Sequence, residues 1–358
     1  MLPYLLLLII VLFVIVLQEI NIDVIVFKSK VSVLLLSISF IIFFSIRDYI
    51  GYDYPAYVTI IESQYWDMYL NSGEWLTTLC MLFAHEVEDY HVFFAIVSVI
   101  SFTSLISSLN NNSFFSTSTG WGMLCFLAMP LGFIEGLSTS RQFVAMSIVL
   151  YSTKWLIGDN RSFGKFILGI LVATGFHITS IISLLMYPIS SLKFKYRYLP
   201  IILVGIVILG VFSFTILSKY MPILEIYSLR YLQEMKGGEN GGSLQILMWI
   251  ICAVIGIFFR RFGKKIPYYD MFLKCYLMGV GLVILVAPFS FNEAFRIGGA
   301  MLYCYMFLIP YFFSSIKLNQ RCYIKILFAI VFSSLYIYAL SITIPNGDSY
   351  VPYRTLFD

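Results

Sequence analysis

Long apolar stretches, separated by short polar segments, recur along the chain from Leu2 to Leu340. A helix that crosses a membrane needs about 18 or more mostly apolar residues, and windows of about that length predict about twelve spans. These windows lie at 2–17, 31–46, 91–109, 118–134, 140–157, 163–176, 178–192, 199–217, 244–259, 268–288, 297–313 and 324–342. The pattern therefore predicts an all-α fold, a polytopic integral membrane bundle in which residues 1–358 form a single transmembrane domain.

One apolar segment is too short to cross a membrane. Trp75–Ala84 is apolar for only about ten residues and runs into the charged cluster His85–Asp89. We interpret it as a half-helix that dips into the membrane interface. Polar loops are then expected at 47–90 and 218–243.

Composition agrees with a membrane protein and excludes several functions. Hydrophobic residues make up 60% of the chain and charged residues 12%, with a mean hydropathy of +0.90, whereas soluble domains carry roughly 25% charged residues. The sequence contains neither a P-loop nor a G-x-G-x-x-G motif, so any chemistry must run without bound ATP or a nucleotide sugar. The first apolar stretch has no basic flank and no small-residue cleavage site, which favours a retained span over a signal peptide.

The cysteines and carboxylates suggest neither a metal nor a cofactor. The six cysteines mostly lie inside apolar stretches, and none forms a C-x-x-C pair: Cys80, Cys125, Cys252, Cys275, Cys304 and Cys322. This pattern indicates neither a disulfide framework nor a zinc site. No cluster of carboxylates suggests a divalent cation site, so we predict a protein that is independent of metals and cofactors.

Positive charges set the predicted orientation, because short cytoplasmic loops concentrate lysine and arginine. An N-terminus outside the cytoplasm places most of the 23 basic residues inside, namely Lys28, Lys30, Lys154, Arg161, Lys165, Lys193, Lys195, Arg197, Arg260, Arg261, Lys264, Lys265, Lys274, Lys317, Arg321 and Lys325. Counting 75–84 as a full crossing would instead bring Asp48, Asp53, Glu62, Asp67 and Glu74 inside, and we reject it on that ground. Loops 47–90 and 218–243 therefore face outward.

The basic residues left on the outer side are mostly arginines: Arg47, Arg141, Lys219, Arg230, Lys236, Arg296 and Arg354. A guanidinium group binds phosphate or carboxylate through two parallel hydrogen bonds. The outer face is therefore a candidate for anion recognition.

The segment Arg47–Tyr57 follows the second span and combines Arg47 and Asp53 with several tyrosines. Rings such as Tyr54 and Tyr57 offer apolar faces with hydroxyl edges, which suit sugar binding. An interfacial aromatic belt with an ion pair from Arg47 to Asp48 or Asp53 explains the same residues and stays open as an alternative.

Two predicted helices begin with an arginine in the first turn. Ser140-Arg141-Gln142 opens one span, where free N–H groups form an anion site. A cation there opposes the helix dipole unless Glu135 or a bound anion neutralises it, or unless the side chain extends to the lipid headgroups. Arg296 repeats this pattern near the start of a later span, where Glu293 alone can neutralise it.

A histidine and a glycine-rich loop complete the candidates on the outer face. His177 lies between the spans 163–176 and 178–192, where it is either a polar cap or a neutral base. The loop 218–243 contains Arg230 and a run of glycines that suits a lid or a plain flexible loop. The C-terminal segment Tyr350–Arg354 should lie on the same side and fold back onto that loop. His85 and His91 flank acidic residues and are interpreted as solvated charge.

Taken in order along most of the chain, these motifs resemble the EpsG-like branch of the Wzy polysaccharide polymerases. The resemblance rests on Arg47…Gly51-x-Asp53-Tyr54-x-x-Tyr57, Ser140-Arg141-Gln142-x-x-Ala145, Phe176-His177-x-x-Ser180 and Arg296. It implies a glycosyltransferase that joins lipid-linked oligosaccharide repeat units at the periplasmic face of the bacterial inner membrane to make O-antigen or related polymers. The implied partners are undecaprenyl-diphosphate-linked oligosaccharides, membrane lipid and a chain-length regulator, with no nucleic acid.

Such chemistry needs an acid–base residue and diphosphate ligands. His177, Asp53 and Glu293 are the candidate bases. The candidate ligands for the diphosphate and the sugars are Arg47, Arg141, Arg230, Arg296, Tyr54, Tyr57, Ser140 and Gln142. An O-antigen ligase uses the same donor with a lipid A–core acceptor and stays open. A lipid-linked oligosaccharide flippase or other transporter would carry charged residues in mid-span, whereas here they gather at span ends; an acyltransferase is a further alternative.

Overall fold

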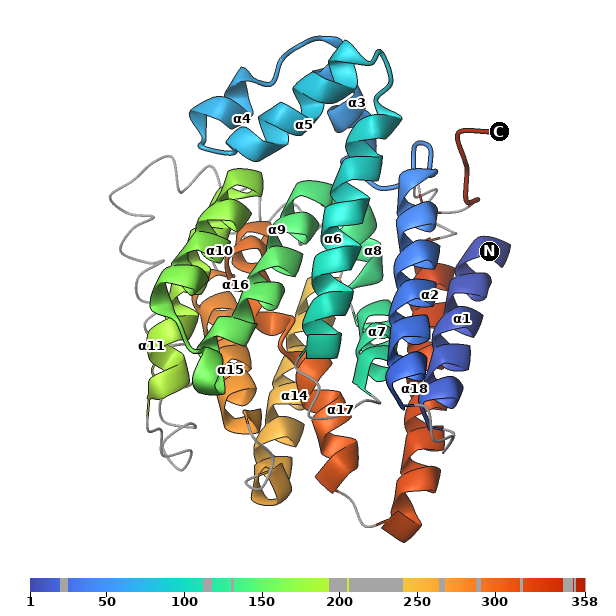
Figure 1. Ribbon diagram of the computed structural model, residues 1–358, viewed down its shortest axis with the longest axis vertical. Coiled ribbons are helices and arrows are strands. Elements are labelled where there is room, and N and C mark those ends of the chain that lie inside the picture. Colours follow the sequence, from blue (N-terminus) through green and yellow to red (C-terminus); the bar gives the residue numbers. More distant parts are fainter. Residues whose placement is uncertain are drawn as a thin grey trace. The chain divides into compact units, whose positions relative to one another are not determined.

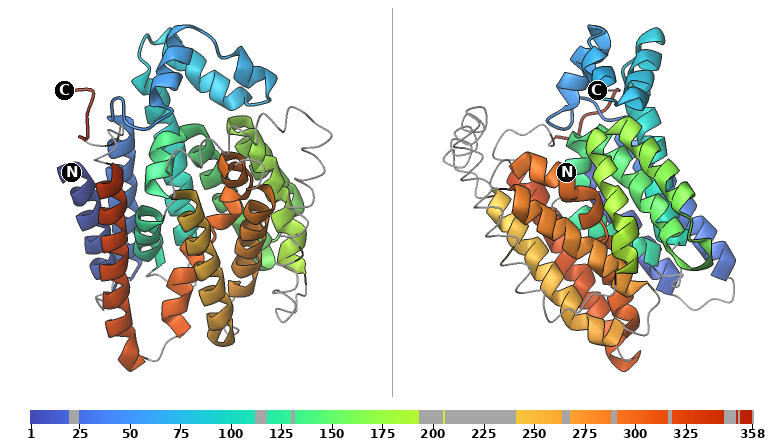
Figure 2. Two further views of the ribbon diagram at one scale, coloured as in Figure 1. Left: turned by 180° about the vertical axis from the view of Figure 1, so that it is seen from behind. Right: turned by 90° about the vertical axis from the view of Figure 1, so that its left-hand side faces the viewer.

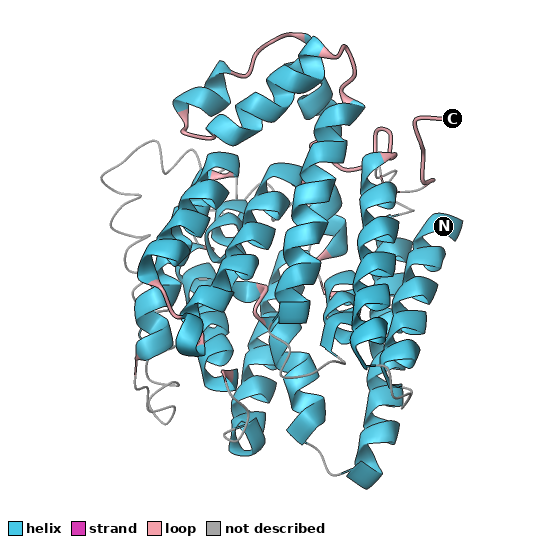
Figure 3. Cartoon of the chain, viewed as in Figure 1, coloured by secondary structure: helices cyan, strands magenta, loops and turns pink. Residues whose placement is uncertain are grey.

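The computed structural model describes residues 1–19, 25–111, 118–129, 132–192, 205, 241–263, 268–287, 291–315, 318–343, 350 and 352–357. Within these residues the regular elements are helices (Figure 3), and the only β pairing is an isolated antiparallel bridge between Arg47 and Thr355. The prediction of an all-α fold is therefore confirmed.

Several of these helices have the length and composition of membrane spans. Five are long and apolar enough to cross: Leu2–Glu19, His91–Asn110, Tyr269–Val286, Glu293–Phe313 and Cys322–Ser341. Shorter apolar helices lie at Lys30–Ser45, Thr119–Ala128, Phe163–Phe176, Ile178–Ser191 and Ile246–Arg260. By the length and composition of its helices, the chain is a multi-pass membrane protein. The predicted span 199–217 falls outside the described residues except for Gly205.

The chain divides into two compact units. The first consists of Met1–Leu184 and Ile309–Asp358, and the second of Leu185–Leu308. In the first unit the helices are α1 (Leu2–Glu19), α2 (Ile25–Ser45), α3 (Tyr54–Glu62), α4 (Asp67–Asn71), α5 (Trp75–Glu86), α6 (His91–Asn111), α7 (Ser118–Ala128), α8 (Phe133–Ser138), α9 (Ser140–Ser152), η1 (Thr153–Leu156), η2 (Gly158–Asn160), α10 (Phe163–Phe176) and α18 (Leu318–Thr343). Two elements continue across its boundaries, η3 (Ile178–Leu185) and α17 (Tyr305–Ser315).

Most long helices of the first unit run side by side (Figures 1 and 2). The α2 helix packs on α1 and α6, α6 on α9, and α9 on α10, while α7 packs on α1 and α18. Their shared core is rich in aromatic side chains in mutual contact: Phe40, Phe44, Phe102, Phe126, Phe133 and Phe143. The predicted span 118–134 is broken, because α7 ends at Ala128 and α8 begins at Phe133.

Three short helices lie across one end of this bundle rather than along it. Figure 1 shows α3, α4 and α5 forming this layer, with α5 packed against α6 and α10. The α5 helix has 12 residues, which agrees with a half-helix and is too short for a crossing. Pro55 at the start of α3 suits a helix N-terminus.

The second unit is built around one central helix. Its elements are α11 (Met186–Ser191), α14 (Gly241–Gly263), α15 (Tyr269–Val286) and α16 (Phe291–Leu302). The α15 helix packs on each of the other three. Close packing of α15 on α16 depends on glycine, since a Cβ atom at Gly298 would lie 2.8 Å from the carbonyl oxygen of Gly279.

The C-terminal segment attaches to the end of α2. The amide of Asp48 donates to the carbonyl of Arg354 over 3.1 Å, and the amide of Leu356 donates to the carbonyl of Ile46 over 2.9 Å. We expected this segment to fold onto the loop 218–243. Its described part pairs with residues 46–48. Residues 218–240 of that loop lie outside the described residues, so the expected contact stays a prediction.

Candidate functional site

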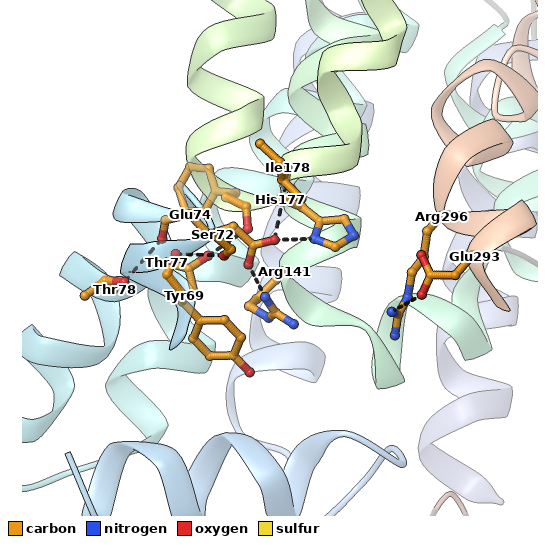
Figure 4. A network of polar contacts seen from close by, with 11 residues as sticks. Tyr69, Ser72, Glu74, Thr77, Thr78, Arg141, His177, Ile178, Glu293 and Arg296 are labelled. Atoms are coloured by element: carbon orange, nitrogen blue, oxygen red, sulfur yellow. Dashed lines mark hydrogen bonds and ion pairs between the residues drawn. The ribbon is translucent and has the colours of Figure 1, made fainter. Parts of the chain in front are cut away.

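Two basic side chains from distant parts of the first unit meet at one carboxylate. Figure 4 shows His177 and Arg141 pointing toward Glu74 from separate helices. The Nδ1 atom of His177 lies 2.8 Å from Oε1 of Glu74. Arg141 forms an ion pair with the other carboxylate oxygen through Nη1. Each oxygen of Glu74 thus binds a different basic side chain.

A tight turn delivers Glu74 to this position. The α4 helix ends in a Schellman motif, in which the amide of Gly73 donates to Leu70 over 3.0 Å and the amide of Glu74 donates to Tyr69 over 2.8 Å. Gly73 adopts a φ of +88°, a conformation that glycine reaches without steric cost. Glu74 follows immediately and precedes α5, so the turn sets the direction of its side chain.

His177 is held where α10 ends. Its amide closes the last turn of α10 by donating to Ala173 over 3.0 Å. The hydroxyl of Thr77 in α5 donates to the carbonyl of Phe176 over 2.9 Å. Gly175 permits this approach, because a Cβ atom there would lie 2.9 Å from the Leu76 side chain. The junction of α5 and α10 therefore brings Glu74 and His177 together.

Arg141 lies in the first turn of α9, as predicted, and its neighbours restrain the guanidinium. The guanidinium carbon lies 3.9 Å from the ring centroid of Tyr69 and 5.7 Å from that of Tyr57, within the range of cation–π attraction. The sequence suggested Glu135 or a ligand as the group that neutralises this cation, and the ion pair in the structure is with Glu74. The side chain keeps 17% of its surface exposed, so solvent still reaches part of the guanidinium.

Two nitrogen atoms of the site remain without a partner among the described residues. These are Nε2 of His177 and Nε of Arg141, both buried. Leaving a buried polar atom unpaired costs free energy, about 1–3 kcal/mol for a neutral group. Both atoms can form a hydrogen bond with a further group, Nε of Arg141 as a donor and Nε2 of His177 as a donor or an acceptor, depending on the tautomer.

The electrostatics of the site favour a charged Glu74. Burial by itself raises the pKa of this carboxyl, since the side chain is only 4% exposed. The hydrogen bond with His177, the positive charge of Arg141 and the hydrogen bond from the amide of Ile178, at 3.2 Å, together hold the pKa below its ordinary value. Mainly through burial, the pKa of Tyr57 rises to about 12, so its phenol stays protonated beside Arg141.

Arg47 does not join this site. Its side chain is 1% exposed and donates to the carbonyl of Leu137 over 2.7 Å and to Oγ of Ser140 over 2.6 Å. The guanidinium also lies 5.2 Å from the ring centroid of Phe44. These contacts tie the end of α2 to the start of α9. Arg47 donates to a carbonyl and a hydroxyl rather than to Asp48 or Asp53, its expected ion-pair partners, and its role as a ligand stays a prediction.

The two tyrosines expected to bind sugars are buried. Tyr54 is 0% and Tyr57 2% exposed, and Tyr54 stacks on Phe94 with ring centroids 4.0 Å apart. Neither ring face is open to a sugar in this structure. Gln142 and Ser140 are buried as well. Within the segment Arg47–Tyr57, the exposed tyrosines are Tyr49 and Tyr52 instead.

Four predicted candidates remain to be described. Asp53 precedes the first residue of α3. Glu293 and Arg296 belong to the second unit, where they form an ion pair of 2.7 Å along one helix (Figure 4), as the structural alternative predicted. Arg230 lies outside the described residues.

Glu74 is the member of the site that the sequence did not reveal. The only local signal was a glycine turn, Ser72-Gly73, directly before an acidic residue at a helix start, and an acid there usually interacts with the helix dipole alone. Its partners lie 67 and 103 residues away. No spacing rule connects such distant positions.

Comparison with known proteins identifies the family. A family model described as EpsG family matches residues 30–355, a range that includes Glu74, Arg141 and His177. No curated protein and no solved structure matches the chain. Because the match covers most of the sequence, the chain belongs to the EpsG family, a family of membrane proteins linked to exopolysaccharide synthesis.

Proposed function

We propose that this protein is a polysaccharide polymerase. It transfers a growing glycan from polyprenyl diphosphate to a lipid-linked repeat unit at the periplasmic face of the bacterial inner membrane. The observation that carries this proposal is the buried cluster in which Glu74 binds both an imidazole and a guanidinium. A base and an anion-binding group side by side are what a diphosphate-linked glycosyl donor requires.

The base in this proposal is His177. In a neutral imidazole one ring nitrogen carries the proton and the other holds a lone pair. The Nε2 atom has no hydrogen-bond partner among the residues that the structure describes. It is therefore suited to take a proton from an acceptor hydroxyl. Asp53 and Glu293 remain the alternative bases.

Arg141 is the proposed diphosphate ligand. A guanidinium fits two phosphate oxygens at once and stabilises negative charge that develops on a leaving group. The ring of Tyr69 and the carboxylate of Glu74 hold this guanidinium in place, so little entropy is lost when the substrate binds. Arg296, which the sequence suggested as a further ligand, stays a prediction.

The reaction then proceeds as a displacement. Nε2 of His177 removes the proton of the acceptor sugar hydroxyl, and the oxygen bonds to the anomeric carbon of the donor glycan. The bond from that carbon to the diphosphate oxygen breaks with its electron pair, and polyprenyl diphosphate leaves beside Arg141. The products are the elongated lipid-linked glycan, a lipid diphosphate and a proton on the imidazole.

The test uses full-length protein in liposomes with a lipid-linked repeat unit. We expect His177→Ala and Arg141→Ala each to lower the rate of polymer formation about 100-fold or more. Both variants should still insert into the membrane normally. The matched controls are His85→Ala, at a half-buried histidine, and Arg161→Ala, at an exposed arginine.

The product separates the proposal from its closest rival. Polymer-length banding supports polymerisation, whereas transfer only to a lipid A–core acceptor would identify a ligase that uses the same donor. Full polymer length in both the His177 and the Arg141 variant would overturn the assignment of this site.

A further inference from the structure

The Glu74 carboxylate is shared between two groups that come from different helices. Oε1 accepts from Nδ1 of His177 and from the amide of Ile178, while Oε2 pairs with Arg141. The side chain is 4% exposed, so these contacts are made away from bulk water. A buried carboxylate with this set of partners has a defined orientation, because neither oxygen is free to rotate away.

We propose that Glu74 is a positioning residue for the glycosyl transfer proposed above, on which this inference rests. It holds the His177 imidazole with its proton on Nδ1, so that Nε2 presents a lone pair to the acceptor hydroxyl. Through its other oxygen it keeps Arg141 beside that imidazole. One side chain thereby sets the distance between the base and the ligand of the leaving group.

The proton position follows from the partners. An ionised carboxylate can only accept hydrogen bonds, so the ring nitrogen that faces it, Nδ1, must be the donor. A free histidine instead carries the proton mainly on Nε2, which would leave no lone pair there. A carboxylate behind an imidazole is a recurrent means of selecting one tautomer.

The surroundings of the imidazole support this division of roles. The charged and titratable groups that the structure places around it are Glu74 before α5, Arg141 on α9, and Tyr57 and Tyr69 against Arg141. Among these, only Glu74 contacts the ring nitrogen Nδ1 by hydrogen bonding. The tautomer of His177 is therefore set at a single contact.

Two substitutions separate the two halves of the role. In Glu74→Gln the side-chain amide oxygen takes the place of Oε1, because Nδ1 of His177 and the amide of Ile178 both donate to that position. The NH2 group of the glutamine then faces Arg141, which is also a donor. This variant keeps the His177 contact and loses the Arg141 pair. Glu74→Ala loses both contacts.

The readout that does not depend on activity is the proton position on the ring. The chain has three histidines, so the ¹⁵N spectrum of histidine-labelled protein in liposomes is simple, and a His177→Ala sample assigns the third signal. His85 and His91 serve as internal references, with partners of their own in Gln64 and Asp89. We expect the Nδ1–H tautomer at His177 in the wild type and in Glu74→Gln, and the Nε2–H tautomer in Glu74→Ala.

Polymer formation is measured on the same samples. We expect Glu74→Ala to reduce the rate about 100-fold or more and Glu74→Gln to fall between it and the wild type. The matched control is Asp270→Ala, which removes another carboxylate that binds two basic residues, Arg260 and Lys274, and we expect its rate to stay within about twofold of the wild type.

The outcomes are distinct. An unchanged tautomer in Glu74→Ala, or equal rates for the Ala and Gln variants, would overturn the positioning role. If Glu74→Ala fails to fold, the wild-type tautomer still decides, because an Nε2–H proton there contradicts the proposal. A tautomer change without any loss of rate, together with full activity of His177→Ala, would instead refute the proposed function and leave the Glu74–His177 contact standing.

Discussion

The Nδ1 atom of His177 lies 2.8 Å from Oε1 of Glu74, although 103 residues separate the two in the chain. This contact joins the turn before the half-helix α5 to the end of α10. Arg141 reaches the same carboxylate from the first turn of α9. The site therefore depends on how three helix ends meet, and changes at any of these ends test it.

The turn that carries Glu74 should require glycine. We expect Gly73→Ala to destabilise the folded protein by about 1–2 kcal/mol, because a φ of +88° is unfavourable for a residue with a Cβ atom. Polymer formation should fall as well, since Glu74 follows directly. Thermal unfolding in detergent measures the first effect. Gly164→Ala is the control, as a Cβ atom there meets nothing within 4 Å, and equal stability of the two variants would contradict the turn argument.

Stability should depend on the charge of Glu74 at low pH. Because the pKa of this carboxyl is held below its usual value in the folded state, ionised Glu74 stabilises the folded protein. That contribution is complete above the unfolded pKa of about 4.3 and disappears as the pH falls through the lower folded value. We expect the difference in unfolding temperature between wild type and Glu74→Gln to be constant from about pH 7 to 5 and to shrink below about pH 4. A difference that grows on acidification would show the opposite sign.

Arg47 should act on stability rather than on substrate binding. Its removal leaves the carbonyl of Leu137 and the hydroxyl of Ser140 without their donor in a buried region. We expect Arg47→Ala to cost about 3 kcal/mol or more in the free energy of unfolding. Denaturation of the purified variant measures this cost. A normally stable variant with a raised KM for the lipid-linked donor would restore Arg47 to the binding site.

The C-terminal segment should protect the end of α2. Ending the chain after residue 349 removes the acceptors of the Asp48 amide and of the Tyr4 hydroxyl, which are the carbonyls of Arg354 and Tyr350. We expect faster hydrogen exchange at the Asp48 amide in the shortened protein, because that amide loses its carbonyl partner. Phe357→Ala, which changes a side chain that is 80% exposed, is the control and should leave the exchange rate unchanged.

Much of the helical framework was predictable because its signals are local. Apolar length alone located α1, α6 and α10 to within a few residues and α18 to within six, and the weakness of the segment 75–84 marked α5 as a half-helix. The same signals placed Arg141 at the start of a helix and His177 between two helices. Each of these conclusions depends on neighbouring residues in the chain.

Only the tertiary structure decided which charges meet. The sequence by itself determined a helical membrane protein, because in lipid the backbone N–H and C=O groups must pair with one another, which leaves few folds other than helices. It also placed basic side chains at the helix ends. It did not determine that Glu74 binds Arg141 and His177, or that Arg47 and Tyr54 are buried. A charge can be buried only where packing supplies its partner, and that partner comes from helices far away along the chain.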